Sequence, residues 1–266
     1  MAAPAPYLAR VYFKEEVREQ ITVDGSEYPF NLPVVRNLDI EFASPVTFFV
    51  GENGTGKSTV IEAIASVCRL PVSGGGRNEL SGTHGPDKVS PLARALRPSF
   101  RRRPPDAYFL RAEFQAHLAS LLDERHDDPD FLGDAYGRYG GRSLHSRSHG
   151  EAFLAILQNR ITSGLLLFDE PESALSPQRQ LALLALMSML AAAGNSQFIV
   201  ATHSPILLTF PEAQILAFDG GTLQQVALED TAHFQITKSI LQNPAAYWRH
   251  LRENENGRDG RRQGEE

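Results

Sequence analysis

Hydrophobic positions along the chain follow strand-like and helix-like patterns in turn. Apolar or alternating runs at 7–14, 34–42, 46–50, 107–112, 165–168, 197–201 and 215–218 predict strands. Residues 60–65, 114–125, 150–159 and 180–192 carry patterns typical of helices. Strands that alternate with helices indicate a mostly parallel central sheet with flanking helices, and the first runs indicate an antiparallel N-terminal β part. The sequence therefore predicts an α/β fold.

Glycine, proline and charge patterns predict how the chain is organised. Residues 71–105 are rich in glycine and proline and predict a long surface loop, and 23–26 predict a turn. We expect one domain over residues 1–251, with a loop-rich and partly helical insertion at about 70–147. Residues 252–266 are charged and almost free of apolar side chains, so a disordered tail is expected there.

Composition indicates an ordinary globular protein. Of 266 residues, 42% are hydrophobic and 22% charged, and the net charge of −6 gives no global sign of nucleic-acid binding. Cys68 is the one cysteine, which excludes an internal disulfide and favours a reducing compartment. No signal peptide is visible, and the longest apolar run, 181–193, is too short to span a bilayer and predicts a buried helix. We therefore expect a soluble, cytoplasmic protein without a membrane segment.

The segment Gly51–Thr59 matches G-x-x-x-x-G-K-[ST], the phosphate-binding P-loop. It lies between a predicted buried strand and a predicted helix, the context in which backbone N–H groups and the helix N-terminus bind an anion. Lys57 would reach the β- and γ-phosphates of ATP, and the Ser58 hydroxyl would bind Mg²⁺. The expected nucleotide-binding residues are Glu52, Asn53, Gly54, Thr55, Gly56, Lys57, Ser58 and Thr59.

Two further strand ends carry candidate chemistry. The apolar run 165–168 ends in Asp169 and Glu170, the Walker B pattern, in which Asp169 would hold Mg²⁺ and Glu170 would act as general base. The run 198–201 is followed by His203, which would face the phosphates from the next strand end. An acidic turn and a structural histidine are the alternatives, and the P-loop favours the functional interpretation of both.

Ser148 and Glu151 have the spacing of a capping box at the start of the predicted helix 150–159. A helix that begins with Ser-x-Gly is also an anion-binding candidate, which adds Ser148 and Gly150 to the nucleotide-binding residues. This segment lies about twenty residues before the Walker B pattern.

Taken together, these motifs resemble the ABC class of P-loop ATPases over residues 35–245, in the stand-alone "AAA family ATPase" branch. That branch is similar to SMC-like, RecF-like and overcoming-lysogenization-defect ATPases. The chain looks most like predicted bacterial ATPases with Ser-His-Gly-Glu, here Ser148–Glu151, and Asp-Glu-Pro-Glu-x-Ala-Leu-Ser-Pro, here Asp169–Pro177.

The resemblance implies roles and an assembly. Lys57, Glu170 and His203 would be catalytic, and 173–176 would be the D-loop. Ser148 and Gly150 would be the signature motif and would act on the γ-phosphate held by the opposing subunit. Two protomers would enclose two ATP molecules with Mg²⁺ in an ATP-dependent homodimer, and hydrolysis would release it.

The chain also departs from the transporter ATPases of this class. Glu172 follows Pro171 where they have threonine, and Ser176 replaces the usual D-loop aspartate. His149 and Glu151 replace a glycine and a glutamine of their signature motif. Glu113 and Gln115 are candidates for the Q-loop residue. Tyr28 and Phe30 are candidates for an adenine-stacking ring, although core packing is favoured for each.

The predicted function is Mg-dependent ATP binding and hydrolysis that drives a conformational change in nucleic acid or a protein effector. The alternatives are a nucleotide-binding subunit of an ABC transporter, a P-loop kinase or phosphotransferase, and an ATP-binding scaffold without turnover. Residues 116–144 are too short and lack the heptads for a coiled-coil arm. The one pointer to a polyanionic partner is the basic run Arg94, Arg97, Arg101, Arg102 and Arg103, for which a solvated loop is the favoured interpretation.

Overall fold

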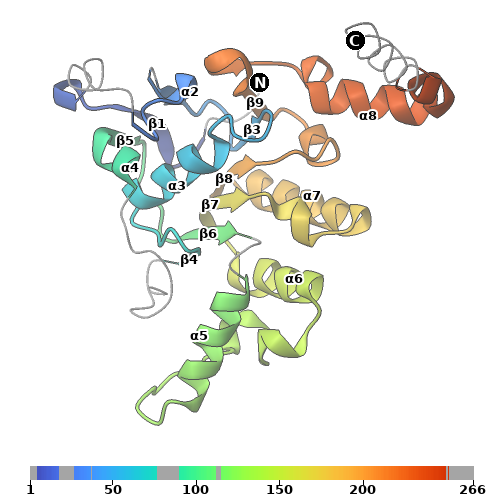
Figure 1. Ribbon diagram of the computed structural model, residues 1–266. Helices are drawn as coiled ribbons and strands as arrows, with labels where there is room; N and C mark the ends of the chain where they lie inside the picture. Colours follow the sequence, from blue (N-terminus) through green and yellow to red (C-terminus); the bar gives the residue numbers. More distant parts are fainter. Residues whose placement is uncertain are drawn as a thin grey trace, which may run out of the picture. The chain divides into compact units, whose positions relative to one another are not determined.

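The computed structural model describes residues 5–17, 27–36, 38–76, 90–111, 115–249 and 251 (Figure 1). The predicted turn at 23–26, residues 77–89, Glu113 and the predicted tail at 252–266 lie outside the described residues. The chain divides into two compact units, Met1–Val226 and Ala227–Glu266.

A seven-stranded sheet forms the centre of the first unit, in the order β10-β9-β3-β8-β7-β6-β4. The five inner strands are parallel, and short antiparallel strands close both edges. Every residue of β3, β6, β7 and β8 is buried, which explains why their sequences are continuous apolar runs. The strands are β3 (Val46–Val50), β4 (Gly75–Gly76), β6 (Ala107–Arg111), β7 (Gly164–Asp169), β8 (Ser196–Ala201), β9 (Gln214–Ala217) and β10 (Gln224–Gln225).

Helices cover both faces of this sheet. After β3 the chain passes through α3 (Lys57–Val67) and later reaches β6, whereas α6 (His149–Arg160) and α7 (Pro177–Ala192) lie on connections that run back across the sheet. Because parallel connections are right-handed, opposite directions place helices on opposite faces. Figure 1 shows α3 and α7 on opposite sides of β7 and β8. The predicted α/β fold with a mostly parallel sheet is confirmed.

A three-stranded antiparallel sheet, in the order β2-β1-β5, forms the N-terminal β part. Its strands are β1 (Leu8–Phe13), β2 (Asp39–Glu41) and β5 (Leu96–Phe100). The buried side chain of Gln197 in β8 joins β1 to the central sheet. Its Oε1 accepts hydrogen bonds from the Tyr7 and Leu8 amides at 3.2 and 2.8 Å, and its Nε2 donates to the Leu8 carbonyl at 2.9 Å.

Two sequence predictions are wrong in this region. The strand expected over 34–42 is replaced by the helical turn α2 (Pro33–Arg36) and the short β2, because proline is favourable at a helix start. The loop expected over 71–105 contains β4, α4 (Pro91–Ala95) and β5. Pro98 within β5 is tolerated because β5 is an edge strand.

The remaining helices follow the predictions more closely. A helix over 114–125 is observed as α5 (Gln115–Asp127), and the one over 150–159 as α6. The run 181–193 is not fully buried, because Leu181 and Met189 on α7 are 58% and 62% exposed. Short 3-10 turns occupy Gly137–Tyr139, Leu144–Ser146, Pro171–Ala174, Leu207–Thr209 and Asp219–Gly221.

The second unit contains a 3-10 turn, Leu228–Asp230, and the helix α8 (Ala232–Gln242). The Thr231 hydroxyl accepts the Phe234 amide at 3.4 Å and so begins α8 as an N-cap. Within the described part of the chain, no helix has the length and apolar character needed to cross a membrane.

The start of β7 supplies a stability test. Gly164 has φ +108, and a Cβ there would overlap the Asp106 carbonyl oxygen and lie 2.8 Å from its carbon. We expect Gly164→Ala to lower the free energy of unfolding by about 3 kcal/mol or more, because both backbone strain and a backbone clash result. Gly194→Ala is the matched control, with φ +71 but no atom within 4 Å, and should cost only about 1 kcal/mol. Urea unfolding followed by circular dichroism measures both, and equal losses would contradict the clash.

Candidate functional site

The P-loop joins the carboxyl end of β3 to α3. Gly51, Gly54 and Gly56 have φ values of 147, 81 and 102°. At Gly51 a Cβ would also lie 3.1 Å from Phe218 Cβ and from Asp219 Oδ1, so a side chain has no room there. No side chain caps the start of α3, which leaves its first N–H groups directed into the loop. This backbone is built to bind an anion.

Lys57 is buried within the P-loop. Its Nζ donates hydrogen bonds to the carbonyl oxygens of Gly51 and Glu52 at 2.7 and 2.9 Å. Burial lowers the pKa of Lys57, and the negative charges of Glu170, Asp219 and Asp169 oppose that shift. Both acceptors are neutral carbonyls, so an anionic phosphate oxygen would be a stronger partner for this ammonium group.

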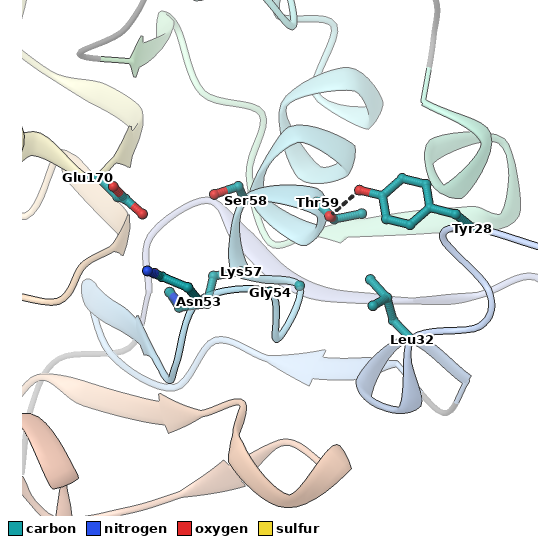
Figure 2. A pocket seen from close by; sticks show the side chains of 9 residues that line it. Tyr28, Leu32, Asn53, Gly54, Lys57, Ser58, Thr59 and Glu170 are labelled. Carbon is teal, nitrogen blue, oxygen red and sulfur yellow. Dashed lines mark hydrogen bonds between the residues drawn. The ribbon is translucent and has the colours of Figure 1, made fainter. Parts of the chain in front are cut away.

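One cavity of about 160 Å³ opens beside the P-loop (Figure 2). It brings together most of the predicted nucleotide-binding residues and Glu170. Its lining is Tyr28, Leu32, Asn53, Gly54, Gly56, Lys57, Ser58, Thr59 and Glu170. Glu52 and Thr55, also predicted to bind nucleotide, are not part of the lining. They instead brace the loop, where the Thr55 hydroxyl donates to the Glu52 carbonyl at 2.9 Å.

Tyr28 lies at the edge of this cavity. Its ring is 65% exposed, and its hydroxyl shares a 2.7 Å hydrogen bond with Thr59 Oγ1 (Figure 2). Core packing is therefore wrong for Tyr28, whereas Phe30 does pack against the core. An exposed aromatic ring beside a phosphate-binding loop offers a flat surface for stacking.

Ser58 and Asp169 place two oxygens side by side. The Ser58 hydroxyl donates to Asp169 Oδ1 at 3.1 Å. Oxygen ligands are the ones Mg²⁺ prefers, so this pair fits the predicted Mg²⁺ site. In the ranges the structure describes, no group of three or more His, Cys, Asp or Glu could hold a metal by itself.

Arg111 is a site residue that the sequence analysis missed. It ends β6 directly opposite Asp169 in the parallel register. Its Nη2 lies 3.5 Å from Asp169 Oδ2, and its Nη1 donates to Glu62 Oε1 of α3 at 2.7 Å. Burial raises the pKa of Asp169 to about 6, and the Arg111 charge and the Ser58 hydroxyl oppose that shift. The available sequence signal was a charged residue at the carboxyl end of a buried strand.

Asp219 was missed as well. It follows β9, and its Oδ1 accepts a hydrogen bond from the Glu52 amide at 3.0 Å. Asp219 therefore holds the P-loop backbone from the neighbouring strand end. The connection spans 167 residues in sequence, and no local motif marks it.

Glu170 and His203 meet at the carboxyl ends of β7 and β8. Glu170 Oε1 lies 3.5 Å from His203 Nε2. Glu170 has φ 48° and ψ 54°, a left-handed conformation that is uncommon for a residue with a side chain and recurs at functional sites. The arrangement places a carboxylate and an imidazole together next to the P-loop cavity.

The Ser148 segment begins α6 as a capping box. Ser148 Oγ accepts the Glu151 amide at 3.4 Å, and Glu151 Oε2 accepts the Ser148 amide at 2.9 Å. A side chain at Gly150 would overlap the Arg179 guanidinium, which lies across the helix start. Neither Ser148 nor Gly150 lines the P-loop cavity.

The predicted Q-loop residue Gln115 is buried at the start of α5 and does not line the P-loop cavity either. Gln115 therefore does not share this cavity with Lys57 and Glu170 of its own chain. The other candidate, Glu113, lies outside the described residues.

Two family profiles match parts of the chain. A profile described as "AAA domain" matches residues 29–89, and one described as "AAA domain, putative AbiEii toxin, Type IV TA system" matches residues 151–209. The first covers the P-loop, and the second covers Asp169, Glu170 and His203. Together they support a P-loop ATPase. No curated protein matches the chain significantly.

Several solved structures are similar at low sequence identity. The structure of cbiO1 from Clostridium perfringens, described as part of the ABC transporter complex cbiONQ, is 15% identical. It covers 94% of this chain and 100% of its own, with a TM-score of 0.47. The SMC head domain from Thermotoga maritima is 16% identical, covers 83% and 98%, and has a TM-score of 0.42. The dimeric structure of MJ0796, described as a bacterial ABC transporter cassette, is 16% identical, covers 75% and 92%, and has a TM-score of 0.41.

The raised pKa of Asp169 predicts a pH dependence. The pKa of this carboxyl group is about 6 in the folded chain and 3.8 in the unfolded chain. As pH falls, the folded chain therefore binds the proton at a higher pH than the unfolded chain does. Protonation therefore favours the folded state as pH falls from 8 to 5. In EDTA without nucleotide, we expect wild type to gain about 1 kcal/mol of unfolding free energy relative to Asp169→Asn over this interval. Urea unfolding at both pH values measures the gain, and a constant or shrinking difference would contradict it.

Proposed function

We propose that this protein binds ATP with Mg²⁺ and hydrolyses it. The observation that carries the proposal is the meeting of three strand ends: the P-loop and Glu170 line one cavity, Asp169 accepts a hydrogen bond from Ser58 of that lining, and His203 contacts Glu170. The P-loop with Lys57 follows β3, Asp169 and Glu170 follow β7, and His203 follows β8. In open α/β sheets, ligands bind at such carboxyl ends.

Each residue of the site has a separate role in ATP binding or hydrolysis. P-loop amides and Lys57 hold the β- and γ-phosphates, and Tyr28 stacks on the nucleobase at the other end of the cavity. Ser58 and Asp169 would hold Mg²⁺, which neutralises developing phosphate charge. Glu170 accepts a proton from the attacking water. His203 donates a hydrogen bond to the γ-phosphate and, through its contact with Glu170, orients that base.

The proposal includes an ATP-dependent homodimer. Ser148 and Gly150 do not line the cavity of their own chain, which supports a contact with a nucleotide bound by a partner. In a head-to-tail pair, the start of α6 would instead contact the γ-phosphate held by the partner. The segment 173–176 would cross the same interface.

Glu170→Gln tests the hydrolysis step. The variant keeps the shape of the side chain but loses the base, so turnover should fall by about 10²- to 10⁴-fold. ATP affinity should stay close to that of wild type, and the dimer should accumulate with MgATP. Phosphate release, calorimetry and light scattering measure the three quantities. Lys57→Ala is the control that should lose binding, and a Glu170→Gln protein that stays monomeric at saturating MgATP would contradict the dimer.

We further propose that the ATP cycle acts on nucleic acid through a basic surface on β5 and the residues after it. Arg97, Arg101, Arg102 and Arg103 are exposed there. The Arg102 guanidinium lies 4.9 Å from the centre of the Tyr7 ring, and the Arg103 guanidinium 4.5 Å from the centre of the Phe100 ring. Stacking holds each guanidinium while its N–H edges stay available for phosphate oxygens.

This surface predicts DNA-stimulated turnover. Replacing Arg101, Arg102 and Arg103 together by alanine should abolish stimulation by DNA at low salt and leave basal turnover unchanged, because these residues lie outside the cavity. The control variant replaces three other arginines by alanine, the exposed Arg36 and Arg138 and the half-buried Arg125, and so loses the same charge. It should keep the stimulation by DNA. ATP turnover over a salt series, with and without duplex DNA, measures both. Unchanged stimulation in the Arg101–Arg103 variant would assign the contact elsewhere.

A further inference from the structure

Glu172 distinguishes this chain from the transporter ATPases that its motifs resemble. We propose that Glu172 is a positioning residue that holds His203 in place against Glu170. The inference rests on the proposed hydrolysis and adds to it a residue that does not line the cavity and acts through His203.

One strong hydrogen bond carries the contact. The His203 amide donates to Glu172 Oε1 at 2.6 Å. A hydrogen bond to a carboxylate is shorter and about twice as strong as one between neutral groups. Glu172 is largely buried, and burial raises its pKa, opposed by the His203 amide. A buried carboxyl group costs stability, and this one binds both the Thr202 side chain and the His203 amide, which indicates that the position of this loop matters.

The backbone explains how two carboxylates reach the same histidine. Glu170 is left-handed, and the 3-10 turn Pro171–Ala174 begins directly after it. This reversal places Glu170 beside the imidazole ring and Glu172 beside the main chain of His203. The main-chain contact restricts where the ring can lie, and the ring contact is the catalytic one. A short threonine side chain at 172 would carry no charge for the same amide.

A second set of hydrogen bonds holds the residue after His203. The Ser204 hydroxyl donates to Gln180 Oε1 at 2.5 Å, and Gln180 Nε2 donates to the Leu175 carbonyl at 3.1 Å. Ser204 and Gln180 are both buried. Residues 203–204 are therefore hydrogen-bonded to Glu172, directly before the segment 173–176, and through Gln180 to Leu175 within it. In the proposed dimer, a partner that moves this segment would also move His203.

Three variants separate positioning from general stability. Glu172→Met keeps the side-chain volume but has no acceptor for the amide, Glu172→Ala removes both, and Glu172→Gln keeps an acceptor oxygen. We expect Glu172→Met and Glu172→Ala to lower kcat by about tenfold or more with KM for ATP nearly unchanged, because misplacing a catalytic group by about 1 Å has effects of this size. Glu172→Gln should recover most of kcat.

A double-mutant cycle with His203→Ala identifies the route of the effect. If Glu172 acts through His203, Glu172→Met should cause little further loss in the His203→Ala background. Equal fold losses in both backgrounds would overturn the proposal. Gln214→Ala is the matched control, since Gln214 is also buried and holds the Ala43 amide and the Glu41 carbonyl away from the cavity. It should lower thermal stability and leave kcat intact.

A measurement without turnover separates this inference from the proposed function. In protein labelled with ¹³C-histidine, the His203 signal is identified by its absence in His203→Gln. We expect Glu170→Gln to shift this signal in the wild-type and Glu172→Gln backgrounds but not in Glu172→Met. The same response in all three backgrounds would overturn the proposal. Absence of ATP hydrolysis by wild type would refute the proposed function, and the signal would still decide the role of Glu172.

Discussion

Parallel pairing of β6, β7, β8, β3 and β9 is the constraint on which the site depends. Because these strands run in one direction, the residues that follow each of them emerge at a single edge of the sheet. Arg111, Asp169, His203, Lys57 and Asp219 are far apart in sequence, and the strand order brings them to the same edge of the sheet. A shift of one residue in strand register would move these side chains to the opposite face of the sheet.

Two charged side chains at this edge of the sheet are buried away from solvent. Asp169 and Lys57 are both buried, and burial shifts the pKa of each toward its neutral form. Arg111 opposes the shift at Asp169, and the surrounding carboxylates oppose it at Lys57. Asp169 and Arg111 lie 3.5 Å apart, so removing either one perturbs the other.

Much of this fold and part of the site could be predicted from local sequence. The P-loop, the capping box at Ser148 and the Asp169–Glu170 pair are short segments whose physics is contained in their own residues. The clustering of Lys57, Ser58, Thr59 and Glu170 at one cavity follows from the alternation of strands and helices.

The remaining features depend on contacts between distant segments, which a local pattern does not contain. Arg111 is defined by strand register, and Asp219 by a hydrogen bond to a loop 167 residues away. Core packing was favoured for Tyr28 because its neighbours in sequence do not show that the ring lies at the cavity. β5 was missed because Pro98 masks a strand whose partner, among the described strands, is the distant β1.

The three hydrogen bonds of Gln197 have a consequence for the order of folding. They join the start of β1 to a strand that the ribosome makes about 190 residues later. Strand β1 can leave the exit tunnel and pair with β2. Gln197, which binds it to the central sheet, is not available until β8 has emerged. Contacts of such sequence separation form late and slowly. The residues of β1 therefore reach their final place only after β8 has been made, and they are accessible to chaperones in the interval.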